Sequence, residues 1–246
     1  MDQTHSATSI LYRDEHVVAV NKPSGMLVHR GWDNDKVVLM TEVRDAIGQW
    51  VYPVHRLDRG SSGVVLFALS SEVAATLGAA FAEQRLEKHY LALVRGVPNA
   101  FGVVDNPVPK KEKGERVAAV SDYRRLAVAG RYSLVEVRPR TGRLHQIRRH
   151  MKHLACPLIG DVRYGKGEHN RHFRDNYSLH RLALHCHGLA LEHPRSDTRL
   201  EIRAPLSEEF ASALIKLGVI ETADSVQARF GSWPETNKAP DELSEA

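Results

Sequence analysis

The sequence has only two cysteines in 246 residues, Cys156 and Cys186, and neither belongs to a CxxC pair. Two cysteines are too few for a disulfide framework, so we expect both to be buried packing residues in a reducing compartment. No apolar run approaches the roughly 20 residues that span a bilayer, and the N-terminus lacks the basic stretch and apolar core of a secretory signal. These absences argue against a membrane-bound or disulfide-stabilised protein and predict a cytoplasmic one.

The basic residues of the chain are concentrated in its centre. Hydrophobic residues make up 42% and charged residues 26%, as in an ordinary soluble protein, and the net charge is only +4. Residues 138–153 nevertheless contain six Arg or Lys, three His and no acid, whereas residues 234–246 are acidic and polar. A basic centre with an acidic end is typical of a protein that binds a polyanion, although a solvated basic face would have the same composition.

Strand and helix patterns interleave along the chain, which favours an α+β fold with a mixed sheet. Strand patterns occur at residues 10–20 (a pair around a turn), 64–69, 90–94, 133–138 and 182–191, and helical patterns at 38–50, 70–85, 143–154 and 207–217. Residues 98–116, which are rich in Pro, Gly, Lys and Glu, are expected to form a long loop or hairpin tip. We therefore predict an N-terminal extension over 1–9, one folded catalytic domain over 10–222 and a flexible acidic tail over 223–246.

Asp58 lies in a loop rich in Gly and Ser, directly before the strand expected at 64–69. A side chain in such a loop is mounted on a rigid sheet edge, where reactive groups are well positioned. The neighbouring Arg56 and Arg59 would favour the ionised carboxylate, which is the state that a covalent nucleophile needs. On local composition alone, a surface aspartate in a turn fits equally well.

Five blocks of the sequence, in order, resemble the motifs of the RluA-type pseudouridine synthases. The block around Asp58, HRLDRGSSGVVL, resembles the signature HRLDRxTSGxLL, with Ser61 in place of the usual Thr. The other blocks are NKPSGMLVH at 21–29, KHYLALVRG at 88–96, TGRLHQIRRH with PLIGDVRYG at 141–165, and LHCHGLALEHP at 184–194, where Cys186 replaces the usual Ala. The resemblance covers roughly residues 10–205.

This resemblance implies the pseudouridine synthase fold, a mixed and mostly antiparallel central sheet flanked by helices and loops. It also implies an isomerase that detaches uracil from C1′ of a uridine in structured RNA, rotates the base and rejoins it through C5. Such an enzyme needs no metal, nucleotide or redox cofactor, and its partner is RNA rather than a membrane.

The family's functional residues carry over to five positions of this chain. Asp58 matches the catalytic aspartate, and Arg56 matches the arginine that fills the space left by the extruded uridine. Tyr90 matches the aromatic residue that stacks on the flipped base and helps in proton handling. Arg148 matches the arginine that pairs with the catalytic carboxylate, and Leu184 matches an apolar residue of the base pocket. Without the resemblance, Tyr90 would be a packing residue of a strand and Arg148 a phosphate contact on a helix.

Several members of the family carry a small basic RNA-binding (S4) domain before the catalytic part. Because the NKP motif begins at residue 21, we expect no such domain in this chain. Residues 27–30 and 177–185 resemble a compact member that acts on uridine 65 in the T-stem of tRNA. The resemblance therefore implies a monomer that modifies tRNA, with a ribosomal RNA site as the alternative. Two other classes stay open: a non-catalytic RNA-binding protein, and a glycosidase that attacks C1′ with a carboxylate and releases free uracil.

Two further patterns suggest other ligands but lack a required feature. Residues 160–166 fit GxxxxGK, but Gly167 stands where a phosphate-binding loop needs Ser or Thr for Mg²⁺. The 14 histidines do not have the spacing of a zinc site, so we expect them to contact phosphates, cap helices or fill the core.

Overall fold

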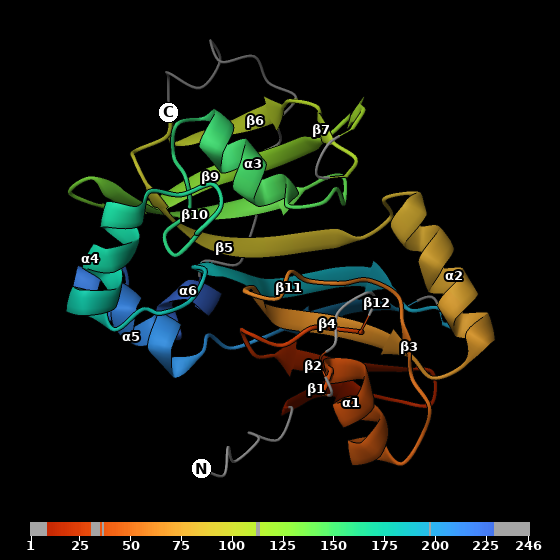
Figure 1. The fold of residues 1–246 in the computed structure, drawn as a ribbon. Coiled ribbons are helices and arrows are strands. Elements are labelled where there is room, and N and C mark those ends of the chain that lie inside the picture. Colours follow the sequence, from red (N-terminus) through yellow and green to blue (C-terminus); the bar gives the residue numbers. More distant parts are fainter. Residues whose placement is uncertain (1–8, 31–34, 36, 112–113, 197, 229–246) are drawn as a thin grey trace.

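The computed structural model describes residues 9–30, 35, 37–111, 114–196 and 198–228, and it shows a large sheet accompanied by helices (Figure 1). The strands are β1 (Ser9–Arg13), β2 (Val17–Lys22), β3 (Tyr52–Pro53), β4 (Ser62–Ala68), β5 (Glu87–Arg95), β6 (Phe101–Asp105), β7 (Val108–Pro109), β8 (Arg116–Val117), β9 (Val120–Ala129), β10 (Tyr132–Pro139), β11 (Leu184–Glu192) and β12 (Arg199–Arg203). The helices are α1 (Leu39–Ile47), α2 (Ser71–Ala82), α3 (Gln146–His153), α4 (Gly167–Tyr177), α5 (Glu208–Leu217) and α6 (Ser225–Ala228).

The main sheet has ten strands, of which eight follow the order β1-β2-β4-β11-β5-β10-β9-β6. Strand β12 pairs with β11 and β3 with β4, while β7 and β8 form a separate two-stranded sheet. The pairing of β4 with β11 is parallel and short, joining His185 to Ser62 and Cys186 to Gly63. The other pairings described in the main sheet are antiparallel. The sheet is thus mixed and mostly antiparallel, as the sequence predicted.

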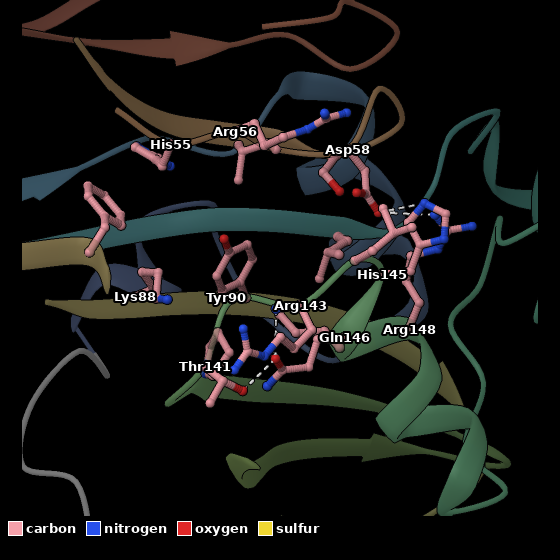
Figure 2. Close-up of a pocket in the computed structure, with 18 of the residues that line it drawn as sticks. His55, Arg56, Asp58, Lys88, Tyr90, Thr141, Arg143, His145, Gln146 and Arg148 are labelled. Carbon is pink, nitrogen blue, oxygen red and sulfur yellow. Dashed lines mark hydrogen bonds and ion pairs between the residues drawn. The ribbon is translucent and has the colours of Figure 1, made fainter. Parts of the chain in front are cut away.

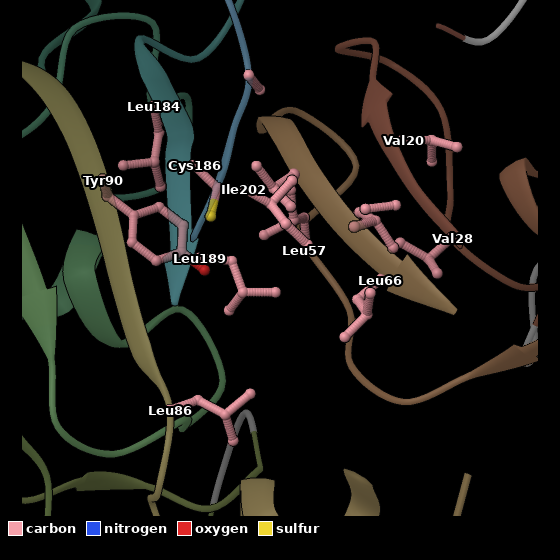
Figure 3. Close-up of a cluster of buried hydrophobic side chains, with 14 of the residues drawn as sticks. Val20, Val28, Leu57, Leu66, Leu86, Tyr90, Leu184, Cys186, Leu189 and Ile202 are labelled. Atoms are coloured by element: carbon pink, nitrogen blue, oxygen red, sulfur yellow. The ribbon is translucent and has the colours of Figure 1, made fainter. Parts of the chain in front are cut away.

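Both faces of the sheet are covered. Successive side chains of a strand point to opposite faces, and along the central strands both sets are buried. On β5, Tyr90, Ala92 and Val94 belong to one buried cluster, whereas Leu91 and Leu93 belong to a second cluster on the opposite face. Figure 3 shows part of the first cluster, in which residues of β5 and β11 lie side by side.

The helices divide between these two clusters. Helices α1, α2 and α3 contribute to the first cluster, with Leu39, Val43, Val73, Leu77, Ile147 and Met151. Helices α4, α5 and α6 contribute to the second, with Phe173, Phe210, Ala213, Leu214 and Val226, and lie together at the left of Figure 1. The first of these two faces also carries the site described below.

The helix and strand patterns read from the sequence are confirmed where apolar residues recur regularly. Ser70 caps α2 by accepting a hydrogen bond from the backbone N–H of Val73, as its position before the apolar pattern indicated. The expected helix at 38–50 is shorter, because Gly48 adopts a left-handed conformation at φ 68° and ends α1. Trp50, whose spacing from Leu39, Val43 and Ile47 predicts a place on the same helix face, lies beyond the end of α1 and is 53% exposed.

Eight elements were not predicted from the sequence. Four of them, β3, β7, β8 and α6, are only two to four residues long, and the other four are longer. Strand β6 lies in the segment expected to be a loop, and β9, β12 and α4 were not expected at all. In these elements polar residues alternate irregularly with few buried apolar ones, so neither a period of 2 nor one of 3.6 stands out.

The C-terminal limit of the folded domain stays a prediction. Helix α6 follows residue 222, and Val226 is buried in the second cluster. Most of the expected acidic tail, residues 229–246, lies outside the described residues, as do residues 1–8 of the expected N-terminal extension. Both cysteines are free and buried, as expected. In the described ranges, no helix is long and apolar enough to cross a membrane.

Candidate active site

A pocket of about 640 Å³ opens on the first face of the sheet, between the loop before β4 and the segment that leads from β10 into α3. All five site residues predicted from the sequence line it: Arg56, Asp58, Tyr90, Arg148 and Leu184. Figure 2 shows Asp58, His145 and Arg148 gathered at one end of the pocket, with Tyr90 and Lys88 further along it. The structure therefore brings together residues that are up to 128 positions apart in the chain (184 minus 56).

Asp58 forms an ion pair with Arg148, whose Nη1 lies 3.0 Å from Oδ2 of the carboxylate. The remaining nitrogens of the same guanidinium donate to Asp161, Nε to Oδ2 at 2.7 Å and Nη2 to Oδ1 at 2.9 Å. Burial alone would lower the pKa of Arg148, but the hydrogen bonds and charges of Asp161 and Asp58 outweigh it and raise the pKa. Arg148 is therefore a permanent cation, held by one carboxylate and aimed at the other.

Of the two arguments from the sequence about the cation beside Asp58, the family resemblance, which named Arg148, agrees with the structure. Arg56 and Arg59, the chain neighbours, were expected to favour the ionised carboxylate. The structure instead pairs Asp58 with Arg148, and Arg59 Nη2 lies 2.6 Å from Asp35 Oδ2. The local sequence could not show this, because the pairing depends on how α3 packs over the loop.

The loop that carries Asp58 is held by hydrogen bonds from the NKPSG segment at residues 21–25. Lys22 is fully buried, and its ammonium donates to the carbonyls of Met26 at 2.6 Å and Arg59 at 3.2 Å. The Ser24 hydroxyl donates to the carbonyl of Gly60 at 2.7 Å. Burial lowers the pKa of Lys22 to about 7. This motif thus supports the loop and does not line the pocket.

The start of α3, which carries Arg148, is fixed by the side chain of Gln146. Its Oε1 accepts from the Thr141 hydroxyl at 2.6 Å, and its Nε2 donates to the Val120 carbonyl and to Ser121 Oγ, each at 2.9 Å. The preceding His145 has φ 53°, a left-handed conformation that is strained for a non-glycine residue. This conformation turns the His145 ring toward the site, with Nε2 3.8 Å from Asp58 Oδ2.

Tyr90 and Leu184 form an apolar wall of the pocket. They come from the paired strands β5 and β11, where Cys186 lies opposite Tyr90. Burial, together with Cys186, raises the pKa of Tyr90 well above its usual value, and burial raises the pKa of the Cys186 thiol to about 12. Both side chains are therefore neutral near pH 7, so Tyr90 can stack on a base or donate a hydrogen bond without adding charge.

Asp58 is the only acidic side chain among the described residues that line the pocket. The basic ones are Arg56, Lys88, Lys110, Arg143 and Arg148. A single carboxylate in a cationic pocket can act as a nucleophile toward part of a polyanion. A glycosidase of the usual kind uses two carboxylates that flank the bond, and the described lining offers one.

The two other ligand patterns are occupied by internal contacts. In the stretch that fits GxxxxGK, the backbone N–H groups of Arg163 and Tyr164 both donate to Asp161 Oδ1 at 2.9 Å, so they are not available to a phosphate. His185 contacts Ser62 Oγ at 2.6 Å and the Ala204 carbonyl at 3.1 Å inside the core. Within the described ranges, no group of three or more His, Cys, Asp or Glu side chains could hold a metal ion.

Comparison with known proteins agrees with this geometry. The model of a family described as RNA pseudouridylate synthase matches residues 16–153. The tRNA pseudouridine synthase C of Vibrio cholerae is 44% identical over 232 residues, which cover 85% of this chain and 95% of that protein. The chain belongs to the RNA pseudouridylate synthase family. It is therefore an isomerase of the pseudouridine synthase class.

Two further members of the pseudouridine synthase family extend the comparison. The tRNA pseudouridine synthase C of Salmonella typhimurium is 43% identical over 234 residues, covering 85% of this chain and 89% of that protein. The solved structure of Human RNA Pseudouridylate Synthase Domain Containing 4 superposes with a TM-score of 0.71 at 25% identity, covering 85% of this chain and 93% of that one. The pseudouridine synthase fold expected from the motifs is thus confirmed.

Proposed function

We propose that this member of the family converts uridine to pseudouridine in tRNA, at position 65 of the T-stem, with Asp58 as the nucleophile. The observation that carries the chemistry is the Asp58–Arg148 ion pair in an otherwise cationic pocket beside Tyr90. The tRNA substrate is supported by the relatives named tRNA pseudouridine synthase C, which match most of the chain. Position 65 rests on the local resemblance at residues 27–30 and 177–185.

The uridine has to leave the RNA helix before Asp58 can reach it, at a cost of a few kcal/mol. Stacking on Tyr90 returns about 1–3 kcal/mol of this cost. The exposed side chain of Arg56, at the mouth of the pocket, fills the gap in the helix. Leu184 packs against the flipped base and keeps water from it.

The reaction breaks the N1–C1′ bond, forms a C5–C1′ bond, and moves one proton from C5 and one onto N1. Asp58 either adds to the base or promotes its loss from the sugar, and both routes need the ionised carboxylate that Arg148 stabilises. The pocket then holds the detached uracil while it turns, so that C5 meets C1′ before the base can escape.

The first experiment measures tritium release from tRNA labelled with [5-³H]uridine, because the proton on C5 is lost only when the new bond forms. The comparison is between wild type, Asp58→Asn and the matched control Asp45→Asn, which changes an exposed aspartate on α1. We expect release by wild type and Asp45→Asn, none by Asp58→Asn, and no free uracil. Free uracil would indicate a glycosidase, and equal release by Asp58→Asn would refute the role of Asp58.

The substrate and position are tested separately. Ribosomal RNA labelled in the same way should release no tritium, and release from ribosomal RNA alone would replace tRNA as the substrate. A tRNA transcript with cytidine at position 65 should lose the signal. Undiminished release from this transcript would leave the chemistry intact and refute position 65.

A further inference from the structure

A short turn between β-bridge residue Leu158 and α4 presents an apolar side chain to solvent beside the active site. Val162 is 94% exposed, whereas the next most exposed large apolar side chain among the described residues, Trp50, is 53% exposed. Exposing an isolated valine so fully contributes nothing to folding. Its neighbours on the turn are the exposed Arg163 and the half-buried Tyr164.

This turn is rigid. The carboxylate of Asp161 accepts the backbone N–H groups of Arg163 and Tyr164 at 2.9 Å, and its carbonyl accepts from Gly165 N at 3.0 Å and from Asn170 Nδ2 at 3.0 Å. Val162 is therefore held in its exposed position by four hydrogen bonds around it. A preorganised contact of this kind loses little conformational entropy when a partner binds.

Cations gather around the same turn. The charged groups of Arg148, Arg149, Lys152 and Arg163 lie 5.1, 5.8, 5.8 and 5.6 Å from the centre of the Tyr164 ring. Asp161 is engaged by Arg148, and Arg149 donates to two uncharged oxygens, the Tyr164 hydroxyl and the Pro109 carbonyl. The charge of Arg148 is balanced by Asp161 and Asp58. Arg149, Lys152 and Arg163 remain as like charges around the same ring, and an anion that approaches them lowers their mutual repulsion.

The turn lies two contacts away from the reacting carboxylate. The Tyr164 hydroxyl is hydrogen-bonded to His145 Nδ1 at 3.1 Å, and His145 Nε2 lies 3.8 Å from Asp58 Oδ2. An RNA strand whose uridine has entered the pocket must continue past its rim on both sides of the extruded nucleotide. We define the rim cluster as Lys152, Val162 and Arg163.

We propose that the rim cluster binds the RNA backbone next to the extruded uridine, with Lys152 and Arg163 on phosphate oxygens and Val162 against the adjoining sugar. The proposal rests on the proposed function, and it adds a backbone subsite to the residues that hold the base. Cationic contacts to phosphates position an RNA without reading its sequence, which suits recognition of an RNA by its shape.

The test compares Lys152→Gln, Arg163→Gln and Val162→Ser with control variants on β1. This strand is the edge strand at one end of the sheet order, far from β10, which leads into α3. Arg13→Gln and Ile10→Ser remove an exposed charge and an exposed apolar side chain there. The measurements are kcat and KM for tritium release from tRNA, and equilibrium binding of fluorescent tRNA over a series of salt concentrations.

We expect each rim charge variant to raise KM roughly fivefold with little change in kcat, and to make the plot of log K against log salt shallower by about 0.9. Val162→Ser should weaken binding without changing this slope, and the β1 controls should match wild type. If the rim variants equal the controls in KM, affinity and salt slope, the backbone subsite is refuted. Tritium release by wild type in the same experiment would still uphold the proposed function. Salt-dependent binding that the rim variants weaken, without tritium release from any RNA, would uphold the subsite and refute the chemistry.

Discussion

Asp161 determines where the Arg148 guanidinium points, so replacing it with Asn separates the stability of the site from its activity. Asp161 is 1% exposed and accepts two hydrogen bonds from Arg148 as well as two from backbone N–H groups. Burial would raise the pKa of Asp161, but the hydrogen bonds from Arg148 and from the backbone of Tyr164 and Arg163 outweigh it and lower the pKa. The carboxylate is therefore ionised at neutral pH and balances a buried cation.

The size of the effect follows from this burial. Removing one partner of a buried ion pair costs about 3–5 kcal/mol, and Asn retains one acceptor, so we expect Asp161→Asn to lower the free energy of unfolding by about 3 kcal/mol. In a protein of this size that loss lowers the Tm by about 6–12 °C. Arg148 then keeps at most one hydrogen bond to residue 161 and is no longer oriented by two, and a shift of about 1 Å at a reacting group lowers kcat by about 10²-fold.

The matched control is Asp122→Asn. Asp122 accepts from Arg140 Nε at 2.8 Å and Nη2 at 2.6 Å, the same two-bond geometry, but the Arg140 side chain is 48% exposed. Water can replace the lost carboxylate there, so we expect a loss of about 1 kcal/mol or less and an unchanged kcat. Thermal unfolding and tritium release are measured on both variants. Equal stability losses, with kcat of Asp161→Asn at the wild-type value, would refute the claim that Asp161 positions Arg148.

Two further predictions concern the sheet. Gly63 has φ +114°, and a Cβ there would lie 2.1 Å from the carbonyl oxygen of Cys186, so Gly63→Ala should prevent stable folding. The control is Gly78 on α2, where an added Cβ meets nothing within 4 Å. Gly78→Ala should raise the free energy of unfolding by about 0.5–1 kcal/mol. Circular dichroism during heating measures both, and a folded Gly63→Ala protein with the wild-type Tm would contradict the geometry. Burial alone would raise the pKa of Glu136, but the hydrogen bonds that its carboxylate accepts from His187 and His89 outweigh burial and lower the pKa to about 2. A carboxyl pKa that is lower in the folded state stabilises the fold above the unfolded pKa of about 4.5, and this stabilisation is lost as the pH falls toward 2. The free energy of unfolding measured with urea should therefore fall less steeply between pH 4.5 and 2 in Glu136→Gln than in wild type.

The sequence predicted the residues of the pocket better than the forces that hold them. Asp58, Tyr90, Arg148 and Leu184 belong to separate motifs, and their order along the chain was enough to place them in one site once the family resemblance was recognised. Chain adjacency predicted that Arg56 and Arg59 balance Asp58, whereas the structure pairs Asp58 with Arg148, the arginine that the family resemblance named. Charge adjacency along a chain says little about charge adjacency in space, because a loop directs successive side chains differently.

The contribution of Asp161 was missed although it lies within the PLIGDVRYG block. Its role depends on a guanidinium 13 residues away that reaches it only when α3 packs on the sheet. Helix α4 was missed for a related reason, since its polar sequence buries only His169 and Phe173. Both features are decided by tertiary packing, which local periodicity does not record.

The position of β11 in the sheet also governs when this protein can fold during its synthesis. Strand β11 occupies the centre of the sheet between β4 and β5, yet it comes from residues Leu184–Glu192, near the end of the described chain. A nascent chain that has emerged only as far as α3 carries Asp58, Tyr90 and Arg148, but it lacks the strand that joins the half bearing Asp58 to the half bearing Arg148. The ribosome must therefore release most of the chain before any of it can bind RNA productively, and fragments ending before residue 184 would expose two incomplete sheet edges.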